Sequence, residues 1–325
     1  MSSISSFNEK LPLISIIIPS FNQGEYLEEC ILSVLNQKYL KTELIVCDGG
    51  SSDNSVEIIK KYSNKIKFWY SEPDNGQAAA ISKGMKYCSG DVINWLNSDD
   101  YYESDALIKV GYAFINQNTN IYCGISRVFG MGNSRFSNGS DIYFNNLEKT
   151  IGMARIDQPE TFFRRSTWLK LGGPNVNFRY LMDRELWIRY LIEFGLNGVV
   201  KTNEHLVNFR MHPNSKTVSE QSGFDIEDKI LFEWLFNYFE ENSTISFNLN
   251  SSQKYNFNAE KVINYRYYGK ILDFYFKNSY QEFDENLSKI NWYLLSFSEK
   301  LNLLKLISRR KLVPLYAKKI YNNLF

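Results

Sequence analysis

Acidic residues stand directly after two of the predicted strands, and two of them are adjacent. Asp48 closes the apolar run 43–48, and Asp99 and Asp100 follow the run 91–96. In open α/β sheets, ligands bind at the carboxyl ends of the strands. Adjacent carboxylates repel each other and are costly to hold unless a cation lies near. The pair therefore predicts a site for Mg²⁺ or Mn²⁺, hard cations that take carboxylate oxygens and complete their shell with substrate phosphates.

A strand-end acid also has a plainer interpretation, because it often caps the helix that follows. For Asp48 that alternative is as good as a ligand role, and for the adjacent pair it is weaker. Other chemistries lack their motifs, since the sequence has no G-x-G-x-x-G, no G-x-x-x-x-G-K-[ST] and no G-x-S-x-G. A dinucleotide fingerprint, a P-loop and a nucleophile elbow are therefore unsupported. None of the four cysteines forms a C-x-x-C pair, so no zinc cage is expected.

Strands and helices alternate through the first hundred residues. Strands are predicted at 13–19, 43–48, 66–70 and 91–96, with amphipathic helices between them. This alternation predicts βαβ units, and hence an α/β fold with a Rossmann-like, mostly parallel sheet flanked by helices. Further strands are predicted at 121–129, 158–164 and 205–211, and a helix at 183–194.

The chain is expected to divide into three parts. Residues 1–12 are polar and loose, 13–218 form the α/β domain, and 219–325 form a helical C-terminal region with a polar loop at 242–258. In that region Ile226, Ile230, Trp234 and Tyr238 repeat every four residues, which predicts a stripe for a core or an interface.

Composition narrows the partners and the location. The 325 residues carry 37 Lys and Arg against 36 Asp and Glu, and such a balance argues against a dedicated nucleic-acid binder. The N-terminus does not read as a signal peptide, and the longest apolar runs are far too short to span a bilayer. We therefore expect a cytoplasmic protein, with attachment to the inner membrane surface left open.

Seven segments, in order, resemble the successive motifs of a family 2 glycosyltransferase over about two thirds of the chain. They are PSFN at 19–22, VCDGGSSD at 46–53, SEPDNGQ at 71–77, LNSDD at 96–100, QPETFFRR at 158–165, MDRELW at 182–187 and FRMHPNSKT at 209–217. The resemblance implies a GT-A fold, a nucleoside-diphosphate sugar as donor and an inverting, single displacement at the anomeric carbon. The composition resembles that of AT-rich bacterial genomes. The resemblance is to the bacterial surface-glycan type of the family, and envelope polysaccharide, lipopolysaccharide and glycoprotein are all left open as acceptors.

The resemblance also places the metal. The family's D-x-D region maps onto 97–100, but Asn97 stands where the family often has its first Asp. An amide binds a metal less well than a carboxylate, so we assign Asn97 to the nucleotide and the metal to Asp99 and Asp100. His212 is expected as a third ligand or a diphosphate donor, and neutral imidazole suits Mn²⁺ better than Mg²⁺. Ser215 and Lys216 are expected to close over the phosphates.

Donor and acceptor groups follow by the same analogy. The base maps onto Asp183, which begins an apolar helix whose N-terminus favours a carboxylate, and Glu185 is the second choice for it. Gln158 or Glu160 either contacts the sugar or forms a buried strand end, and His205 is interpreted as structural. Positive charge near the nucleotide is assigned to Lys83, for which a solvated helix face is the alternative. The full set expected around the nucleotide is Pro19, Ser20, Phe21, Asp48, Gly76, Gln77, Lys83, Asn97 and Asp99.

Residues 300–325 combine basic and apolar side chains, and no Asp or Glu follows Glu299. A basic amphipathic segment can lie on an anionic bilayer, which would suit a lipid-linked acceptor. An ordinary packed helix or a contact between copies of the chain is the alternative. For the whole protein, the alternatives to a glycosyltransferase are a sugar nucleotidyltransferase and a non-catalytic nucleotide-sugar or glycan-binding module on the same fold.

Overall fold

The computed structural model describes residues 11–239 and 257–309, and they form two compact units. Unit 1 contains the described residues up to Ile142 and from Arg155 to 239, and unit 2 contains Tyr143–Ala154 and 257–309. Two of the points where the units divide the chain lie at 142/143 and 154/155. The domain boundary expected at 218/219 stays a prediction. Most of the loose segment predicted for 1–12, most of the loop predicted for 242–258, and residues 310–325 lie outside the described residues.

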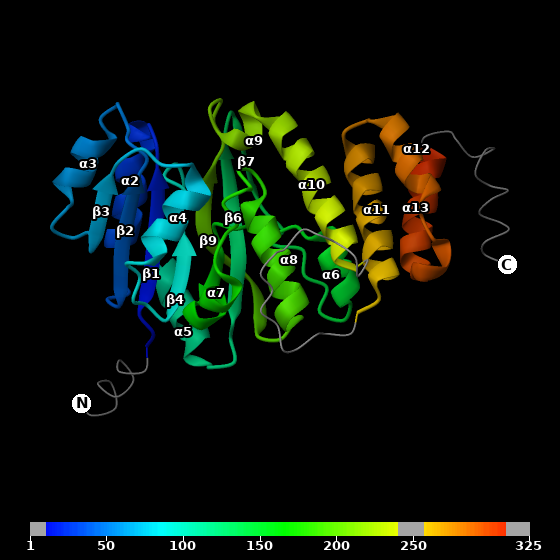
Figure 1. Ribbon diagram of the computed structural model, residues 1–325, viewed down its shortest axis with the longest axis horizontal. Helices are drawn as coiled ribbons and strands as arrows, with labels where there is room; N and C mark the ends of the chain where they lie inside the picture. Colours follow the sequence, from blue (N-terminus) through cyan, green and yellow to red (C-terminus); the bar gives the residue numbers. More distant parts are fainter. Residues whose placement is uncertain (1–10, 240–256, 310–325) are drawn as a thin grey trace. The chain divides into compact units, whose positions relative to one another are not determined.

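Unit 1 is built on a nine-stranded sheet in its described residues, with the order β3-β2-β1-β4-β8-β6-β9-β5 and β7 paired to β6 (Figure 1). The strands are β1 (Ile14–Ser20), β2 (Thr42–Asp48), β3 (Phe68–Ser71), β4 (Val92–Trp95), β5 (Tyr101–Tyr102), β6 (Ile121–Gly130), β7 (Asn133–Phe136), β8 (Thr161–Arg164) and β9 (Val199–Arg210). Its helices are α2 (Gly24–Leu35), α3 (Ser55–Lys61), α4 (Gln77–Met85), α5 (Ala106–Ile115), α7 (Arg165–Leu171), α8 (Met182–Phe194), α9 (Lys216–Ser219) and α10 (Gln221–Phe239).

The first four strands are parallel and lie side by side, as predicted. β1 pairs with β2 and β4, and β2 pairs with β3. In this register Ser20 lies beside Asp48, and Asp48 beside Ser71. The carboxyl ends of these strands therefore meet at one edge, together with the segment that follows β4. Beyond β4 the sheet is mixed, because β8 is antiparallel to both β4 and β6.

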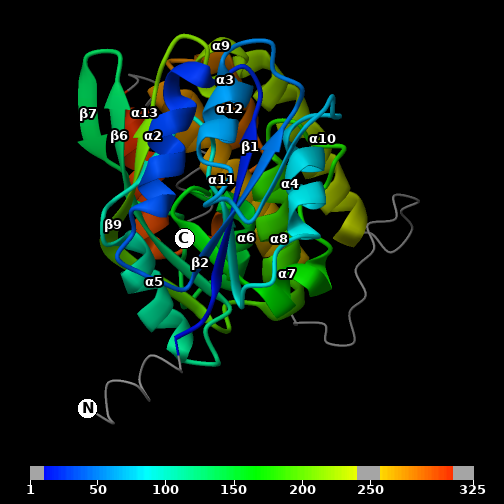
Figure 2. The ribbon, with the colours of Figure 1, turned by 90° about the vertical axis from the view of Figure 1, so that its left-hand side faces the viewer.

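Alternate residues of the parallel strands point to opposite faces, and each face has its own helices. Ile14, Ile16 and Ile18 join residues of α2, α3 and α5 in one core. On the other face Gly84 of α4 approaches Ile17 so closely that a Cβ would lie 2.9 Å from its side chain. Figure 2 shows α2 and α5 on one side of β1 and β2, with α4 and α7 on the other. Helices thus cover both faces, while the carboxyl edge is left to loops.

Unit 2 is a small helical body assembled from two separate segments. It contains α6 (Leu147–Met153), α11 (Ala259–Phe276), α12 (Tyr280–Ser288), the 3₁₀ turn η1 (Trp292–Leu294) and α13 (Phe297–Arg309) (Figure 1). Gly152 of α6 packs against α11, where a Cβ would lie 2.6 Å from Val262 O. Tyr265, Phe283 and Leu303 belong to the common core. No helix among the described residues is long and apolar enough to cross a membrane.

Several elements differ from the sequence predictions. The strand expected at 158–164 begins only at Thr161, so Gln158 and Glu160 lie in the preceding turn. The predicted stripe of α10 is divided, because Trp234 is buried while Ile226 and Ile230 are 60% and 50% exposed. Spacing alone locates a stripe on a helix, but it does not say how much of the stripe is covered.

Candidate active site

The turn after β2 is organised around the buried carboxylate of Asp48. Its Oδ2 accepts hydrogen bonds from the backbone N–H groups of Gly50 and Ser51 at 3.1 and 2.9 Å, and from the Ser71 hydroxyl at 2.6 Å. Its Oδ1 accepts from the Ser51 hydroxyl at 2.6 Å. Gly50 has a φ of +82°, which disfavours any residue with a side chain at that point of the turn. Asp48 therefore holds the turn and the end of β3, and its contact with a nucleobase stays a prediction.

A cluster beside this turn combines an exposed aromatic ring with a buried hydroxyl. Phe21 follows β1 and is 60% exposed. A Cβ on Gly49 would lie 3.3 Å from the Phe21 ring and 3.2 Å from the Asp74 carboxylate, so both side chains lie close to the backbone at Gly49. The hydroxyl of Ser20 is buried without a hydrogen-bond partner among the described residues, and Pro19 is buried in β1. The exposed ring offers a surface for stacking, and the Ser20 hydroxyl is a polar group left unused by the protein.

Asp99 and Asp100 face different surroundings. Asp100 is 1% exposed, and its Oδ1 and Oδ2 accept from the backbone N–H of Arg210 at 2.8 Å and from the Asn97 amide at 3.3 Å. Burial, together with the charge of Asp99, raises the pKa of Asp100 well above its ordinary value. Asp99 instead points its Oδ2 at His212 Nε2, 3.0 Å away, with its side chain 19% exposed. Of the two predicted metal ligands, Asp99 is the one with an accessible carboxylate.

Arg210, to which the sequence assigned no role, holds this corner together at the end of β9. Its Nε donates to the backbone carbonyl of Asp99 at 3.0 Å, and its guanidinium pairs with Glu29. The same group lies 4.9 Å from the centre of the Tyr26 ring, which in turn lies 4.7 Å from the His212 imidazole. The only sequence signal was position, because Arg210 and His212 are two residues apart and residues at that spacing on a strand share a face.

A chain of side-chain hydrogen bonds links Lys216 to the strand-end acids. Lys216 Nζ donates to Gln77 Oε1 at 2.8 Å, and Gln77 Nε2 donates to Asn97 Oδ1 at 2.6 Å. Asn97 completes the chain through its bond to Asp100. Burial lowers the pKa of the Lys216 amine. The structure thus brings Gln77, Asn97, Asp99, Asp100, His212 and Lys216 together at one edge of the sheet, although they are far apart in sequence.

Two other residues predicted near the nucleotide lie on α4 or just before it. Gly76 opens the helix with a φ of +96°, and its N–H donates to Asp74 Oδ1 at 2.8 Å. Lys83 pairs with Glu72, and its amine lies 3.8 Å from the centre of the Tyr70 ring. The contacts of Lys83 therefore fall outside the chain formed by Lys216, Gln77 and Asn97.

The predicted base, Asp183, lies in the first turn of α8. Its Oδ1 accepts from the backbone N–H of Arg184 at 2.8 Å. Burial raises the pKa of the Asp183 carboxyl to about 6, and the charge of Asp157 contributes to the rise. The sequence led us to expect that the helix N-terminus would favour the ionised form, but burial outweighs that effect. A carboxyl that titrates near neutral pH suits general-base catalysis.

Glu185, the second choice for the base, is engaged elsewhere. It is fully buried and paired with Arg189 through two bonds, Nε to Oε1 at 2.6 Å and Nη2 to Oε2 at 2.7 Å. Arg189 also donates to the carbonyl of Gly173 at 2.6 Å. The ion pair of Arg189 is therefore internal. Arg184 bonds the buried Asp228 of α10 at 2.9 Å. The saturated contacts of Glu185 indicate a structural role.

The acceptor-side polar residues are buried as well. Gln158 Nε2 donates to Asn94 Oδ1 at 2.9 Å and to the Trp95 carbonyl at 2.8 Å. Glu160 is fully buried, and burial together with the charge of Asp157 raises its pKa to about 8. These contacts match the alternative of a buried polar strand end. His205 Nε2 lies 3.0 Å from the Val207 carbonyl, which fits its structural interpretation.

Metal-binding capacity is concentrated in one pair of residues. Across residues 11–239 and 257–309, no group of three or more His, Cys, Asp or Glu side chains is arranged to hold a metal ion. Asp99 and His212 nevertheless place one carboxylate oxygen and one imidazole nitrogen 3.0 Å apart. Both are ligand types that Mn²⁺ accepts, and the diphosphate of a substrate would supply further oxygens. The residues therefore fit a metal shared between protein and substrate.

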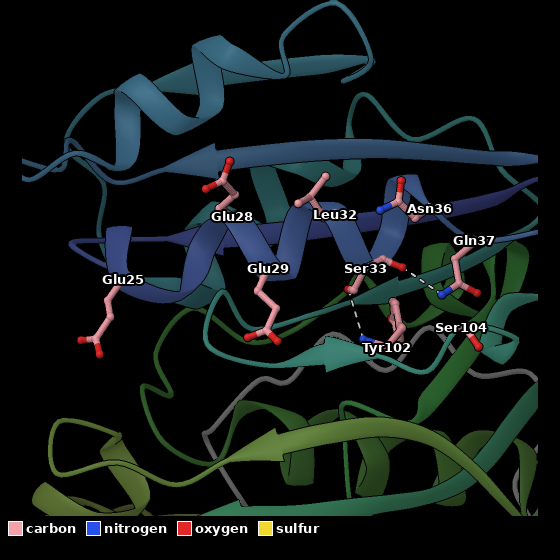
Figure 3. Close-up of a pocket in the computed structure, with 9 residues that line it drawn as sticks. All are labelled: Glu25, Glu28, Glu29, Leu32, Ser33, Asn36, Gln37, Tyr102 and Ser104. Atoms are coloured by element: carbon pink, nitrogen blue, oxygen red, sulfur yellow. Dashed lines mark hydrogen bonds between the residues drawn. The ribbon is translucent and has the colours of Figure 1, made fainter.

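An open groove of about 560 Å³ lies along α2, at a different place from this pair. Its lining comes mainly from α2 and from the end of β5, and it includes Glu25, Glu28 and Glu29 but neither Asp99 nor His212. Figure 3 shows Ser33 and Gln37 bonded within the groove and the glutamates along the helix. No Lys, Arg or His lines it, so it does not suit a diphosphate.

Comparisons with known proteins agree on one family. The model of glycosyl transferase family 2 matches residues 15–170. An uncharacterised glycosyltransferase of Rickettsia typhi is 30% identical over 223 residues, which are 65% of this chain and 67% of the relative.

Solved structures share the fold. S. aureus TarS 1–349 in complex with UDP-GlcNAc has a TM-score of 0.56 at 14% identity, covering 92% of this chain and 88% of TarS 1–349. The mannosyltransferase PcManGT of Pyrobaculum calidifontis, in complex with GDP-Man and Mn²⁺, has a TM-score of 0.53 at 13% identity, covering 97% and 84%. At this identity the likeness shows the GT-A architecture alone.

Proposed function

The chain belongs to glycosyltransferase family 2 and is a transferase that uses a nucleotide-sugar donor, and we propose that it is a metal-dependent, inverting enzyme. The donor we favour is a UDP-sugar. The acceptor is a hydroxyl of a glycan or of a lipid-linked sugar, as in the synthesis of bacterial surface polysaccharides. The observation that carries the proposal is the meeting of Asp99 and His212, 3.0 Å apart, at the edge where the parallel strands end.

The nucleoside is assigned to the ends of β1 and β2. The exposed ring of Phe21 offers a stacking face, and the unpartnered Ser20 hydroxyl can bond the ribose or the base. Asp48 shapes this pocket through the turn at 49–51. UDP-GlcNAc in TarS and GDP-Man in PcManGT are bound by proteins of the same fold, which supports a nucleoside-diphosphate sugar here without selecting its base.

The diphosphate is assigned to the edge between β4 and β9. Asp99 and His212 are the residues that would hold a divalent cation there. When bound, the cation neutralises the charge that develops on the leaving diphosphate. Lys216 adds a positive charge from α9, and Arg210 fixes Asp99 through its backbone carbonyl.

Sugar transfer then requires one proton acceptor. In the proposed step the acceptor oxygen attacks the anomeric carbon, and the bond from that carbon to the diphosphate oxygen breaks. The electron pair of the broken bond leaves with the nucleoside diphosphate, and the hydroxyl proton moves to Asp183. A single displacement of this kind inverts the configuration at the anomeric carbon.

A nucleotide and metal screen tests the donor site directly. The purified chain is melted with UDP, GDP, dTDP or CDP, each with Mn²⁺, Mg²⁺ or EDTA. A ligand that binds the folded state alone stabilises it by about 2.7 kcal/mol at a hundred times its dissociation constant. We expect a shift with UDP that EDTA abolishes. No shift with any nucleotide in a folded sample would contradict the proposal.

The two histidines of the chain provide a matched pair of variants for the metal. We expect His212→Ala to lose the extra stabilisation that Mn²⁺ gives in the presence of UDP. His205→Ala removes an imidazole bonded to the Val207 carbonyl and should keep that stabilisation. Equal behaviour of the two variants would remove His212 from the proposed site.

A further inference from the structure

Exposed apolar side chains recur at helical spacing at the end of unit 2. Tyr293 of η1 and Phe297 of α13 are each 73% exposed, and Leu301, one turn further on, is 41% exposed. The opposite side of α13 is packed, since Leu303 and Leu306 belong to the core of the unit. The helix thus has two apolar sides, and the described residues cover only one of them.

The charged side chains that α13 itself places on the uncovered side have one sign. We define the outer face of α13 as Phe297, Leu301, Lys305 and Arg309, all of which are exposed. The single acid of the helix, Glu299, lies on the inner side and pairs with Lys149. After Glu299 the sequence contains seven Lys and Arg and no Asp or Glu up to its last residue. The outer face therefore has no acidic side chain to offset its cations.

We propose that the outer face of α13, together with Tyr293, docks on the headgroup region of a bilayer that contains anionic phospholipids. An apolar stripe with basic side chains beside it is what an interfacial helix needs, because the stripe enters the headgroup boundary while the cations stay with the phosphates. Tyrosine is also enriched at that boundary.

A second copy of the chain is a poorer occupant for the same face. A two-fold dimer places the same patch on both partners. Lys305 and Arg309 of one copy would then meet the outer face of the other, which has no acid to pair with them. An anionic bilayer satisfies the apolar stripe and the cations together. The proposal goes beyond sugar transfer and does not depend on it.

Vesicle sedimentation with the full chain tests this surface. Vesicles of phosphatidylcholine, with and without phosphatidylglycerol, are incubated with the protein at low and high salt. One variant combines Phe297→Ser with Leu301→Ser, and a second combines Lys305→Glu with Arg309→Glu. Matched controls in unit 1 are Leu40→Ser with Leu169→Ser for exposed apolar surface, and Lys60→Glu with Lys65→Glu for charge.

We expect the wild type to sediment with the anionic vesicles only, and less at high salt. Each basic residue near such a surface contributes roughly fivefold in partitioning, so the double charge reversal should lower binding by a factor of about 25 or more. The apolar variant should lose most of its binding, while both controls bind as the wild type does. Circular dichroism and the nucleotide-induced shift in melting temperature confirm that each variant is folded.

Three results would overturn the proposal. The first is a wild type that does not sediment with anionic vesicles. The second is equal sedimentation with neutral vesicles, or binding that the α13 variants retain. The third is self-association that the Phe297→Ser and Leu301→Ser changes abolish without any vesicle binding, which would assign the face to a second copy. None of these results bears on donor binding, which the nucleotide screen reads separately.

Discussion

Replacing Asp183 with Asn should change stability and activity in opposite directions. The carboxyl of Asp183 has a pKa of about 6, against an ordinary 3.8, because the folded chain buries it. Each tenfold change in proton affinity is worth 1.36 kcal/mol, so ionised Asp183 costs the fold up to about 3 kcal/mol. Partial exposure of the side chain reduces that figure. We expect Asp183→Asn to stabilise the protein by about 1–3 kcal/mol at pH 8.

The sign of the pH dependence follows from the direction of the shift. A carboxyl with a raised pKa holds its proton more tightly in the folded chain than in the unfolded chain. Its favourable contribution is complete below about pH 3.8 and is lost as the pH rises through about 6. The advantage of the Asn variant should therefore shrink by about 1 kcal/mol between pH 8 and pH 5.

Activity should fall in the same variant. Removal of a general base typically lowers the rate by a factor of about 10²–10⁴. The wild-type rate should rise with pH up to about 6 and then level, whereas the residual rate of Asp183→Asn should lack that rise. Asn keeps a side-chain oxygen that can accept the Arg184 N–H, so the first turn of α8 should survive.

Urea unfolding at pH 5 and pH 8, with nucleoside-diphosphate release from the donor, measures both effects. Metal-dependent UDP binding should be unchanged, which separates catalysis from donor binding. The reasoning is refuted if Asp183→Asn keeps the wild-type rate, or if its pH profile still rises through about 6. A variant less stable than wild type at both pH values would contradict the raised pKa of Asp183.

Three further variants test neighbouring assignments. Glu185→Ala leaves Arg189 buried without its partner and should lower the free energy of unfolding by about 3–5 kcal/mol in urea; a stable variant with a lost rate would make Glu185 the base after all. Lys216→Met should lower the affinity for UDP by a factor of about 10 or more, since hydrogen bonds to charged groups contribute about 1.5–3 kcal/mol. Lys83→Met is the control and should leave the affinity unchanged. Equal losses of affinity in calorimetry would contradict the assignment of Lys216 to the diphosphate. Phe21→Ala should weaken UDP binding by about 1–3 kcal/mol if the base stacks on the ring, with an unchanged melting temperature because Phe21 is 60% exposed.

The parallel half of the sheet was readable from the sequence because its signals are local. Short apolar runs separated by amphipathic helices predicted β1 to β4 with each end within two residues of its position in the structure. Because these strands are parallel neighbours, their carboxyl ends share one edge of the sheet, and the acids that follow β2 and β4 lie there. Two short strands escaped prediction, because β5 has only two residues and the four residues of β7 are all exposed and show no apolar alternation.

Contacts between segments that are far apart in the chain could not be predicted from the sequence. Asp99 and Asp100 are neighbours, and what separates their roles is the backbone N–H of Arg210, 110 residues further along the chain. The assembly of unit 2 is similar, because α6 joins helices that follow it by more than a hundred residues. The close approach of Gly152 to α11 that allows this has no signature in the local sequence.

The carboxylates of Asp48 and Glu185 differ from that of Asp183 in the number of hydrogen bonds that they accept. Asp48 accepts four hydrogen bonds, and Glu185 accepts two bonds from the guanidinium of Arg189. Both are saturated, and a substrate could reach them only by displacing protein donors. Asp183 is bonded through the backbone N–H of Arg184, and its pKa is raised to about 6. Because a buried charge with few donors is costly to fold, Asp183 can take up a proton near neutral pH, and the pH profile of Asp183→Asn tests whether sugar transfer uses that proton.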